Sequence, residues 1–520
     1  MTPMLRLGRT LLTNTPLVSS RPTLGIPFRP KRVCLAALLM VTLVGCTRGA
    51  GLTINGSQTY QVIDGFGVNA NHRSWNTNEL PAVLDALIDQ AGMTLFNVIF
   101  DNNNWEAAND NSDPNDMNWA YYNGVYSAPE FQKFWGIMAY LNQRGVNNGL
   151  VPFLQGPVAL WMGGLALTPG YESEYAETIA SLLVYARNTQ HLQFSVVGPV
   201  NEPDNTYAGI HLSGADQYVT VMRNLAQQLD TNGLSDIRSS GPELASTSTN
   251  WLGAMMGDPL VMAKLDHFGL HSYLGASPDA TGVYDFIQQS AYPDRHFWMT
   301  EFNVWCANCQ ASVGGDNSWA YARGTATCLL NHLANGASAG LVWEGYDSQY
   351  TDFNPTTGGN DPPHWSYWGL LAVNDINAGV KTYTPRKGFY TVAQVARFVR
   401  PGARRIDVSG ASAPLTVLAF YNTNNGQFTL TGANTNSSPA ALSGTLTNLP
   451  ALASLELYYT DSTTSLFDGG AVPVTNGSFS VFVPADCVFT LAATNSQVPE
   501  PAPAPTFSFG PPLTPVWDVS

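Results

Sequence analysis

The sequence predicts an α/β protein: a (β/α)8 barrel, or TIM barrel, with a smaller β-sandwich beside it. From Gly65 to about Val380, short apolar runs alternate with longer amphipathic segments, which is the pattern of parallel strands joined by helices. After Pro401, residues 404–494 instead alternate apolar and polar side chains and are punctuated by Asn, Gly, Ser and Thr. That second pattern is typical of a small antiparallel sandwich.

Eight apolar runs are the expected barrel strands, because a closed barrel of this kind needs eight strand–helix units. The runs are Gly65–Val68, Leu95–Phe100, Leu150–Leu154, Phe194–Val200, Ile237–Gly241, Phe268–Tyr273, Phe297–Phe302 and Gly340–Trp343. The segments between them include the amphipathic stretches Tyr175–Tyr185 and Ala215–Leu229, which we expect to be helices. We therefore assign residues 65–394 to the barrel.

The residues before the barrel have strand character of a different kind. Leu52 to Ile63 is expected to form two short strands around a turn at Asn55-Gly56, a hairpin signal. Antiparallel strands have no place in an all-parallel barrel, so we expect them to join the sandwich. The sandwich is then built from residues 51–64 together with 395–494. The proline-rich residues 495–520 are expected to form a disordered tail.

Residues 1–46 resemble a bacterial lipoprotein signal and are set apart from the fold. A basic stretch at 29–32 precedes the apolar run Val33–Val44, which is too short to span a bilayer. The run leads to Gly45 and Cys46, and in the signals it resembles this cysteine is lipidated. The protein is therefore expected to be exported, either anchored to the outer membrane through Cys46 or secreted after an ordinary cleavage. Membrane contact is expected through the lipid anchor alone.

Composition narrows the class of partner. The chain has 23 Lys+Arg against 38 Asp+Glu, a net charge of −15, and so lacks the basic character that nucleic-acid binding needs. Aromatic residues make up 11% and charged residues 12%, which suits an exported protein that stacks rings on neutral ligands. A large core would use such residues as well. The oligomeric state is open, and a monomer is favoured.

Beyond the leader the cysteines are Cys306, Cys309, Cys328 and Cys487. The Cys306-x-x-Cys309 spacing is compatible with a redox motif or with half of a zinc site. No second Cys-x-x-Cys or histidine pair follows at zinc spacing, so no metal site is expected. In an exported protein a disulfide among Cys306, Cys309 and Cys328 is favoured, with its connectivity open.

Two glutamates lie where a barrel enzyme places its catalytic groups, at the carboxyl ends of strands. Glu202 follows the fourth predicted strand and Glu301 ends the seventh. An acid that abuts an apolar run is costly unless it is paired or functional. Cleavage of a glycosidic bond needs two carboxyl groups across a cleft, one protonated and one ionised. Either glutamate alone could cap a helix or form an ion pair, but the two together point to glycoside hydrolysis.

The sequence around these acids resembles the retaining glycoside hydrolases of the large (β/α)8 clan. Three further segments narrow the resemblance to glycoside hydrolase family 30 or a close relative, a family that pairs a barrel with a β-sandwich made from both chain ends. The segments that carry the resemblance are Asn201-Glu202-Pro203, Trp298-Met-Thr-Glu301, Gln61-Val-Ile-Asp-Gly-Phe-Gly67, Thr384–Tyr390 and Phe398–Gly402.

The resemblance implies a role for each residue at the site. Glu202 would be the general acid/base and Glu301 the nucleophile of a double displacement, with the carboxyl groups about 5–5.5 Å apart. Asn201 would bind the sugar 2-hydroxyl, unless it serves only the turn before Pro203. Tyr273 would hydrogen-bond the nucleophile. No cofactor is implied.

Histidine and tryptophan side chains near the strand ends are also expected to contact the glycan. His271 shares a strand face with Tyr273 and is either a ligand contact or a buried structural histidine. Trp343 ends the eighth predicted strand and matches the aromatic platform beneath the sugar, with a core tryptophan as the alternative. Trp161 and Trp305, in loops after the third and seventh strands, are candidates for further sugar subsites or for loop packing.

The second predicted strand departs from the family. Relatives carry an arginine there, whereas Leu95–Asp101 has none. Arg73, Asn97 and Asn102 are the candidates to take its place, so the preferred sugar is open. The leading interpretation is an exported retaining β-glycosidase that acts on a β-linked polysaccharide or glycoconjugate. The alternative is a catalytically inactive surface lipoprotein that binds glycans.

Overall fold

The computed structural model describes residues 50–101, 104–206, 209–277, 279–310, 314–354 and 356–494. The predicted leader with Cys46 and the predicted tail at 495–520 lie outside these residues, so both stay predictions. Within the described part of the chain, no helix combines the length and the apolar character that crossing a membrane requires.

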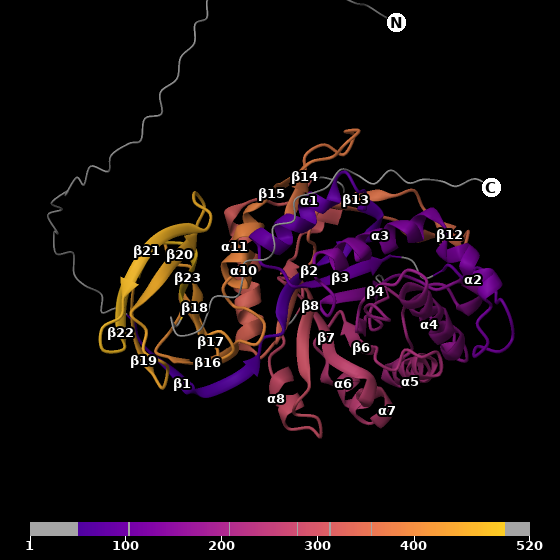
Figure 1. Ribbon diagram of the computed structural model, residues 1–520, viewed down its shortest axis with the longest axis horizontal. Helices are drawn as coiled ribbons and strands as arrows, with labels where there is room; N and C mark the ends of the chain where they lie inside the picture. The colour runs from indigo at the N-terminus through magenta and orange to yellow at the C-terminus, as the bar shows by residue number, and fades with distance from the viewer. Residues whose placement is uncertain are drawn as a thin grey trace, which may run out of the picture. The chain divides into compact units, whose positions relative to one another are not determined.

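Eight parallel strands form the barrel, as the sequence predicts (Figure 1). They are β2 (Gly65–Asn71), β3 (Leu95–Phe100), β4 (Leu150–Leu154), β5 (Val196–Val197), β6 (Arg238–Leu244), β7 (Leu265–Leu274), β8 (His296–Val304) and β9 (Ala339–Val342). Their spatial order is β4-β3-β2-β9-β8-β7-β6-β5. The two ends of this sheet meet, because the N–H of Leu154 in β4 donates to the carbonyl of Gly198 just after β5 at 2.7 Å. Each predicted apolar run overlaps one of these strands.

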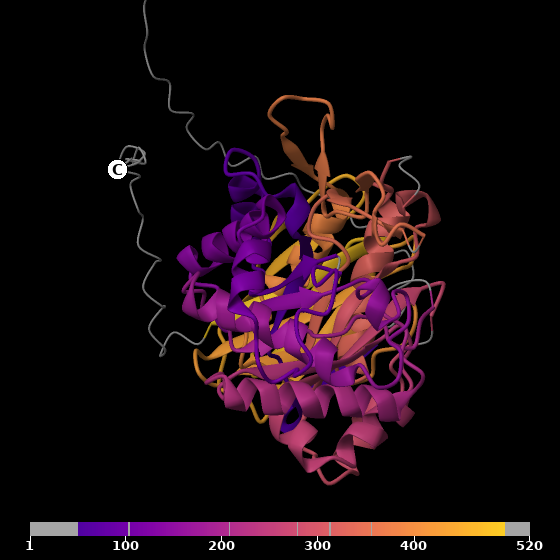
Figure 2. The same ribbon diagram turned by 90° about the vertical axis from the view of Figure 1, so that its right-hand side faces the viewer.

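Helices surround the strands, and their apolar faces fill the space between (Figure 2). The α-helices are α1 (Leu80–Asp85), α2 (Trp119–Tyr126), α3 (Pro129–Gln143), α4 (Glu172–Asn188), α5 (Ala215–Thr231), α6 (Thr249–Met256), α7 (Pro259–Lys264), α8 (Val283–Gln288), α9 (Ala307–Gln310), α10 (Trp319–Ala334) and α11 (Lys387–Ala396). The 3-10 turns are His72–Ser74 and Leu160–Met162, and a π-turn covers Ala86–Gln90. The two predicted amphipathic stretches lie within α4 and α5.

Three two-stranded ribbons extend the chain after β9. They are β10 (Ser348–Tyr350) with β13 (His364–Ser366), β11 (Phe353–Asn354) with β12 (Gly359–Asn360), and β14 (Leu371–Val373) with β15 (Tyr383–Pro385). Because they follow the carboxyl end of a barrel strand, they add to the face on which barrel enzymes carry their active sites.

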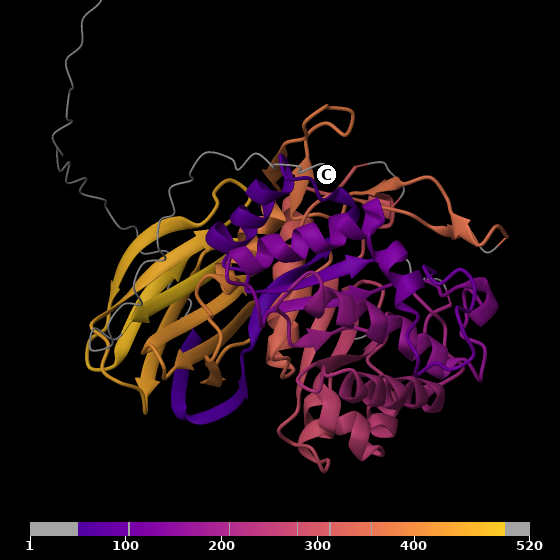
Figure 3. The same cartoon turned by 45° about the vertical axis from the view of Figure 1, so that its right-hand side comes forward.

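A second, mixed sheet of nine strands is built from both ends of the described chain (Figure 3). Its strands are β1 (Ala50–Val62), β16 (Arg404–Ser409), β17 (Leu415–Asn422), β18 (Gln427–Asn434), β19 (Ala440–Thr447), β20 (Ser454–Thr460), β21 (Phe467–Pro473), β22 (Ser478–Val483) and β23 (Cys487–Thr494). Strand β1 pairs with β16 and β19, which confirms that the N-terminal segment joins the C-terminal region. The sheet curves around one core, since Leu442 near one edge and Leu455 near the other belong to the same apolar cluster.

The predicted hairpin at Asn55-Gly56 is wrong, because β1 runs through these residues as one strand. The Asn55 side-chain oxygen accepts hydrogen bonds from the N–H and the hydroxyl of Ser57, at 3.1 and 2.8 Å. The local turn chemistry therefore produces an irregularity in the pairing with β16, between Asn55 and Thr59, rather than a chain reversal.

The second sheet is joined to the barrel through α11 and through β1. Phe389 of α11 and Phe420 of β17 belong to the same apolar core as the barrel. The N–H of Ile63, just after β1, donates to the carbonyl of Ala403 at 2.8 Å, next to the start of β16. The exact domain boundaries stay a prediction; the one placed at residue 394 falls inside α11.

Candidate active site

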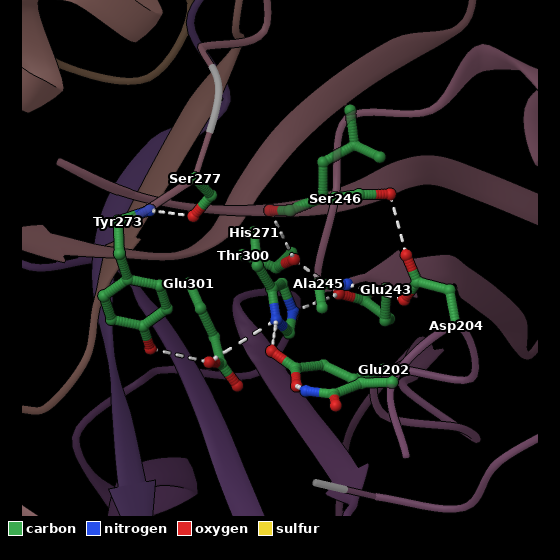
Figure 4. Close-up of polar contacts among 12 residues, drawn as sticks. Glu202, Asp204, Glu243, Ala245, Ser246, His271, Tyr273, Ser277, Thr300 and Glu301 are labelled. Carbon is green, nitrogen blue, oxygen red and sulfur yellow. Dashed lines mark hydrogen bonds and ion pairs between the residues drawn. The ribbon is translucent and has the colours of Figure 1, made fainter. Parts of the chain in front are cut away.

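Glu202 and Glu301 lie together at the carboxyl ends of their strands. Glu301 is in β8, and Glu202 follows β5 with a backbone φ of 43°, in the left-handed region that non-glycine residues seldom adopt. One carboxylate oxygen of Glu202, one of Glu301 and a ring nitrogen of His271 all lie within 4.8 Å of one another. Figure 4 shows His271 between the two carboxyl groups. The fold thus brings together the two acids that the sequence singles out.

The loop that carries Glu202 is tied to the next strand. The Glu202 N–H donates to the carbonyl of Glu243 in β6 at 2.8 Å. Two residues further on, Asp204 accepts hydrogen bonds from the N–H of Ala245 at 2.9 Å and from the hydroxyl of Ser246 at 2.7 Å. These contacts hold the Glu202 backbone in a conformation that is otherwise unfavourable.

His271, in β7, is fully buried against carboxylates. Its Nδ1 lies 2.9 Å from Glu202 Oε1 and 3.4 Å from Glu301 Oε2, and its Nε2 lies 3.5 Å from Glu243 Oε2. Burial alone would lower the pKa of His271, but Glu301, Glu202 and Glu243 raise it well above its ordinary value. The three carboxylates therefore favour the imidazolium form of His271.

Tyr273 completes the surroundings of Glu301, as the resemblance implies. Its hydroxyl donates to Glu301 Oε2 at 2.9 Å, while Glu301 Oε1 has no hydrogen-bond partner among the described residues. Burial raises the pKa of Glu301 to about 8, opposed by His271 and reinforced by the Glu202 carboxylate. Glu301 is therefore harder to ionise than an ordinary glutamate.

Glu243 is a third buried acid that sequence reasoning missed. The hydroxyl of Thr300 donates to its carboxylate. Burial alone would raise the pKa of Glu243, but His271 lowers it below its ordinary value. A usable signal was present, since Glu243 also lies at the carboxyl end of a barrel strand. The predicted run ended at Gly241, two residues short of it.

Trp343 immediately follows β9 and lines a cavity. The cavity measures about 500 Å³, and its walls combine polar residues such as Asp101 and Asp352 with apolar ones such as Leu165 and Phe353. Trp343 is mostly buried, and it belongs to the aromatic cluster against which Tyr273 packs. The cavity wall and the hydrogen-bond partner of Glu301 are therefore neighbours.

A larger hollow, of about 770 Å³, lies at the opposite end of the barrel. Its walls include Thr94, Gly149 and Ser195, which directly precede β3, β4 and β5 respectively. These positions mark the amino ends of the strands, far from the carboxyl ends that carry Glu202 and Glu301. Size alone therefore does not identify the site, and the smaller cavity is the one at the carboxyl end of the barrel, where Trp343 follows β9.

The remaining predicted contact residues divide into two groups. Asn201 is buried, and its side-chain oxygen has no hydrogen-bond partner among the described residues. Trp305 is 45% exposed, and its ring centroid is 5.8 Å from that of Tyr273. Trp161 instead donates its indole N–H to the Glu106 carbonyl at 2.8 Å and packs edge-on against Tyr171. Both contacts are those of loop packing.

Cys306 and Cys309 form the disulfide on the segment that follows β8. Both contact the aromatic cluster beside Tyr273. Cys328 and Cys487 are buried free thiols. The favoured disulfide interpretation is therefore the right one, and the paired sulfurs are not available as zinc ligands.

Arg73 does not take the place of the absent strand-two arginine next to Glu301. Its guanidinium pairs with Asp101, Nε to Oδ1 at 2.7 Å, and with Glu130. Asn97 donates to the side-chain oxygen of Asn69 at 3.2 Å, inside the barrel. Asn102 lies outside the described residues.

Two side-chain groups among the described residues have the spacing of metal ligands. His72, Asp101 and Glu130 form the first, and the Arg73 guanidinium already pairs with both of its acids. The second is Glu202, His271 and Glu301, in which Nδ1 of the histidine contacts both acids.

No protein-family model matches the sequence. Solved structures with the same architecture include a glycoside hydrolase family 30 subfamily 8 xylanase from Clostridium acetobutylicum, with 17% identity, 86% of this chain and 100% of that chain covered, and a TM-score of 0.65. A family 30 endoxylanase from Clostridium papyrosolvens matches with 19% identity, the same coverage and a TM-score of 0.62. An endo-β-1,6-glucanase matches with 17% identity, 86% and 95% coverage and a TM-score of 0.61. The protein thus shares the barrel-and-sandwich fold of family 30 glycoside hydrolases.

Proposed function

We propose that the protein is a retaining β-glycosidase that hydrolyses a β-linked polysaccharide or glycoconjugate by double displacement. The observation that carries this proposal is the close approach of Glu202 and Glu301, with carboxylate oxygens within 4.8 Å at the carboxyl end of the barrel. Retaining enzymes hold their two carboxyl groups about 5–5.5 Å apart, whereas inverting enzymes leave about 6.5–9.5 Å for a water molecule.

The surroundings of the two acids support different roles for them. Tyr273 and His271 both approach Glu301 Oε2 and stabilise its charge, which leaves Oε1 to attack the anomeric carbon. In the proposed mechanism Glu301 reacts as the carboxylate, which His271 favours against the rise in pKa that burial causes, and Glu202 carries the proton that it donates to the oxygen of the leaving group. In the second step Glu202 takes a proton from water, and the water oxygen displaces Glu301 from the sugar.

The cavity beside Trp343 suits a neutral sugar. The indole face can carry the apolar face of a sugar ring, and we assign Asn201 to the 2-hydroxyl because its buried side-chain oxygen has no hydrogen-bond partner among the described residues. Asp101 and Asp352 line the same cavity, and Arg73 is already engaged by Asp101. A carboxylated sugar would meet negative charge there. The expected substrate is therefore an uncharged β-linked glycan, with Trp305 available for a further subsite.

Export through the predicted leader fits such an enzyme, because polysaccharides are met outside the cell. Lipidation at Cys46 and anchoring to the outer membrane are part of the proposal, and secretion is its alternative.

The test is an assay of reducing ends with the purified protein on β-linked glucans, xylans, galactans and fucans. Glu301→Gln keeps the shape of the side chain and removes the nucleophile, so activity should fall about 10⁴-fold or more. Activity on one polymer that Glu301→Gln abolishes would establish the function and its substrate class. If no polymer in the panel is cleaved and glycan binding persists in Glu301→Gln, the result would favour the inactive glycan-binding lipoprotein.

A further inference from the structure

Glu243 lies at the centre of contacts that join the two catalytic candidates. Its backbone carbonyl accepts from the N–H of Glu202, and its carboxylate faces Nε2 of His271 at 3.5 Å. Its own φ of 57° is in the left-handed region, and its side chain is fully buried. Gly269, on the neighbouring strand β7, provides the room, since a Cβ there would overlap the Glu243 carboxyl group. The strained backbone of Glu243 and the absence of a side chain at Gly269 thus make room for the buried Glu243 carboxylate.

His271 is the cation that this charge faces. The groups around it are Glu202 from the loop after β5, Glu243 from β6, Tyr273 from β7 itself and Glu301 from β8. Tyr218 of α5 and His267 of β7 lie within electrostatic reach of Glu243, and Glu344, which follows Trp343, lies within reach of Tyr273. In the ion pairs of the described residues, His271 is the one cation that these three carboxylates share.

We propose that Glu243 is a positioning residue whose carboxylate favours the imidazolium form of His271 between Glu202 and Glu301, and so sets the pH range in which Glu301 is ionised. Glu243 contacts Nε2 as an ion pair at 3.5 Å, which leaves Nδ1 to face the two acids, much as a carboxylate orients a catalytic histidine. The inference rests on the proposed function for its kinetic consequence, but the charge of His271 does not depend on any substrate.

Removal of the Glu243 charge should shift the pKa values of the neighbouring groups in the same direction. A negative charge disfavours loss of a proton from the groups nearby, so its removal lowers the pKa of His271 and of Glu301. Both limbs of the bell-shaped dependence of kcat/KM on pH should therefore shift to lower pH in Glu243→Gln, by roughly one unit. Glu243→Asp retains the charge and should keep the limbs of the wild type, even if its kcat falls.

Glu344→Gln is the matched control. Glu344 is also a fully buried acid, but burial raises its pKa to about 8 and the hydroxyls of Ser348 and Ser366 donate to it. Its replacement by glutamine changes no charge in acid, so the acid limb should stay where it is. The proposal would be overturned if the limbs of the kcat/KM profile lay at the same pH in the wild type and in soluble Glu243→Gln. It would also be overturned if the acid limb of Glu344→Gln shifted as far as that of Glu243→Gln.

A second measurement separates this inference from the proposed function. In the whole protein labelled with ¹³C-histidine, the His271 ring should titrate well above the ordinary histidine value, and at lower pH in Glu243→Gln than in the wild type. A wild-type His271 that titrates near 6.5 would overturn the proposal even if Glu243→Gln does not fold. A persistent imidazolium in a protein that cleaves no glycan would reject the glycosidase while leaving the role of Glu243 in place.

Discussion

Two groups of buried carboxyls in this barrel differ in what surrounds them. The first group is Glu202, Glu243 and Glu301 around His271. The second is Glu106, in the loop after β3, with Glu177 on α4, both fully buried. Burial raises the pKa of Glu106 to about 7 and that of Glu177 to about 8, values close to that of Glu301. A perturbed pKa therefore does not distinguish the two groups.

The neighbours of the acids do distinguish them. Glu106 accepts hydrogen bonds from the hydroxyls of Thr178 at 2.7 Å and Tyr122 at 3.2 Å, and the charges that act on Glu177 come from other acids, among them Asp110. These carboxyls avoid the cost of a buried charge by staying protonated. The group around His271 instead contains a histidine whose pKa the carboxylates raise, and it lies at the same end of the barrel as the cavity that Trp343 lines. The comparison teaches that a compensating cation beside a cavity, rather than burial, marks the candidate site.

The largest expected effect sharpens this comparison at one acid from each group. Glu202→Gln removes the group that protonates the leaving oxygen, so kcat/KM should fall about 10²- to 10⁴-fold. Glu177→Gln replaces a protonated carboxyl with a neutral amide of the same shape and should stay within about threefold of the wild type. Reducing-end assays on the substrate found in the panel provide the measurement. Comparable losses in the two variants would place both groups in the catalytic machinery.

A smaller effect is expected at the aromatic residues. Trp343→Ala removes the ring that lines the cavity, and KM should rise about tenfold from lost stacking. Trp161→Ala removes a ring whose contacts are with Glu106 and Tyr171, so it should lower the melting temperature and leave KM near the wild-type value. Kinetics and thermal unfolding of both purified variants test this. A KM increase in Trp161→Ala and not in Trp343→Ala would mean that the sugar stacks on Trp161 rather than on Trp343.

The sequence predicts the barrel and the acid pair because each depends on local pattern. Apolar runs at regular spacing mark the strands, and an acid at a strand end marks a position on the active face. The missed features depend on contacts between distant segments. Glu243 becomes significant only because β7 places His271 opposite it, and Trp161 turns toward Glu106 because two loops fold together. The hairpin prediction failed because an Asn-Gly pair makes the same local hydrogen bonds in a strand irregularity as in a chain reversal.

The group around Glu106 should instead affect stability as pH changes. The folded-state pKa of Glu177, about 8, lies above the ordinary value of 4.5, so the folded chain binds more protons than the unfolded chain between these pH values. Its contribution is thus fully present below about pH 4.5 and is lost as pH rises through about 8. The fall in melting temperature from pH 5 to 8 should be shallower in Glu177→Gln than in the wild type. Glu456→Gln, on the sandwich strand β20, is the control and should follow the wild-type slope. A Glu177→Gln slope equal to that of the wild type would mean that Glu177 is ionised in the folded protein.

The smallest expected effect concerns the disulfide next to the aromatic cluster. Cys306 and Cys309 are separated by 3 positions, so their bond closes a very short loop and restricts the unfolded chain little. Chain-entropy reasoning gives about 2 kcal/mol for such a loop. The double variant Cys306→Ser, Cys309→Ser should therefore melt a few degrees lower, with KM raised about two- to threefold because Trp305 is held less firmly. Its kcat should be unchanged, since Glu301 is fixed within β8 by Tyr273 and His271 rather than by the disulfide. Cys487→Ala, on the sandwich, is the control for loss of a buried sulfur and should leave KM unaltered. A collapse of kcat in the double variant would show that the segment after β8 positions the nucleophile, and would extend the candidate site from the strand ends into this loop.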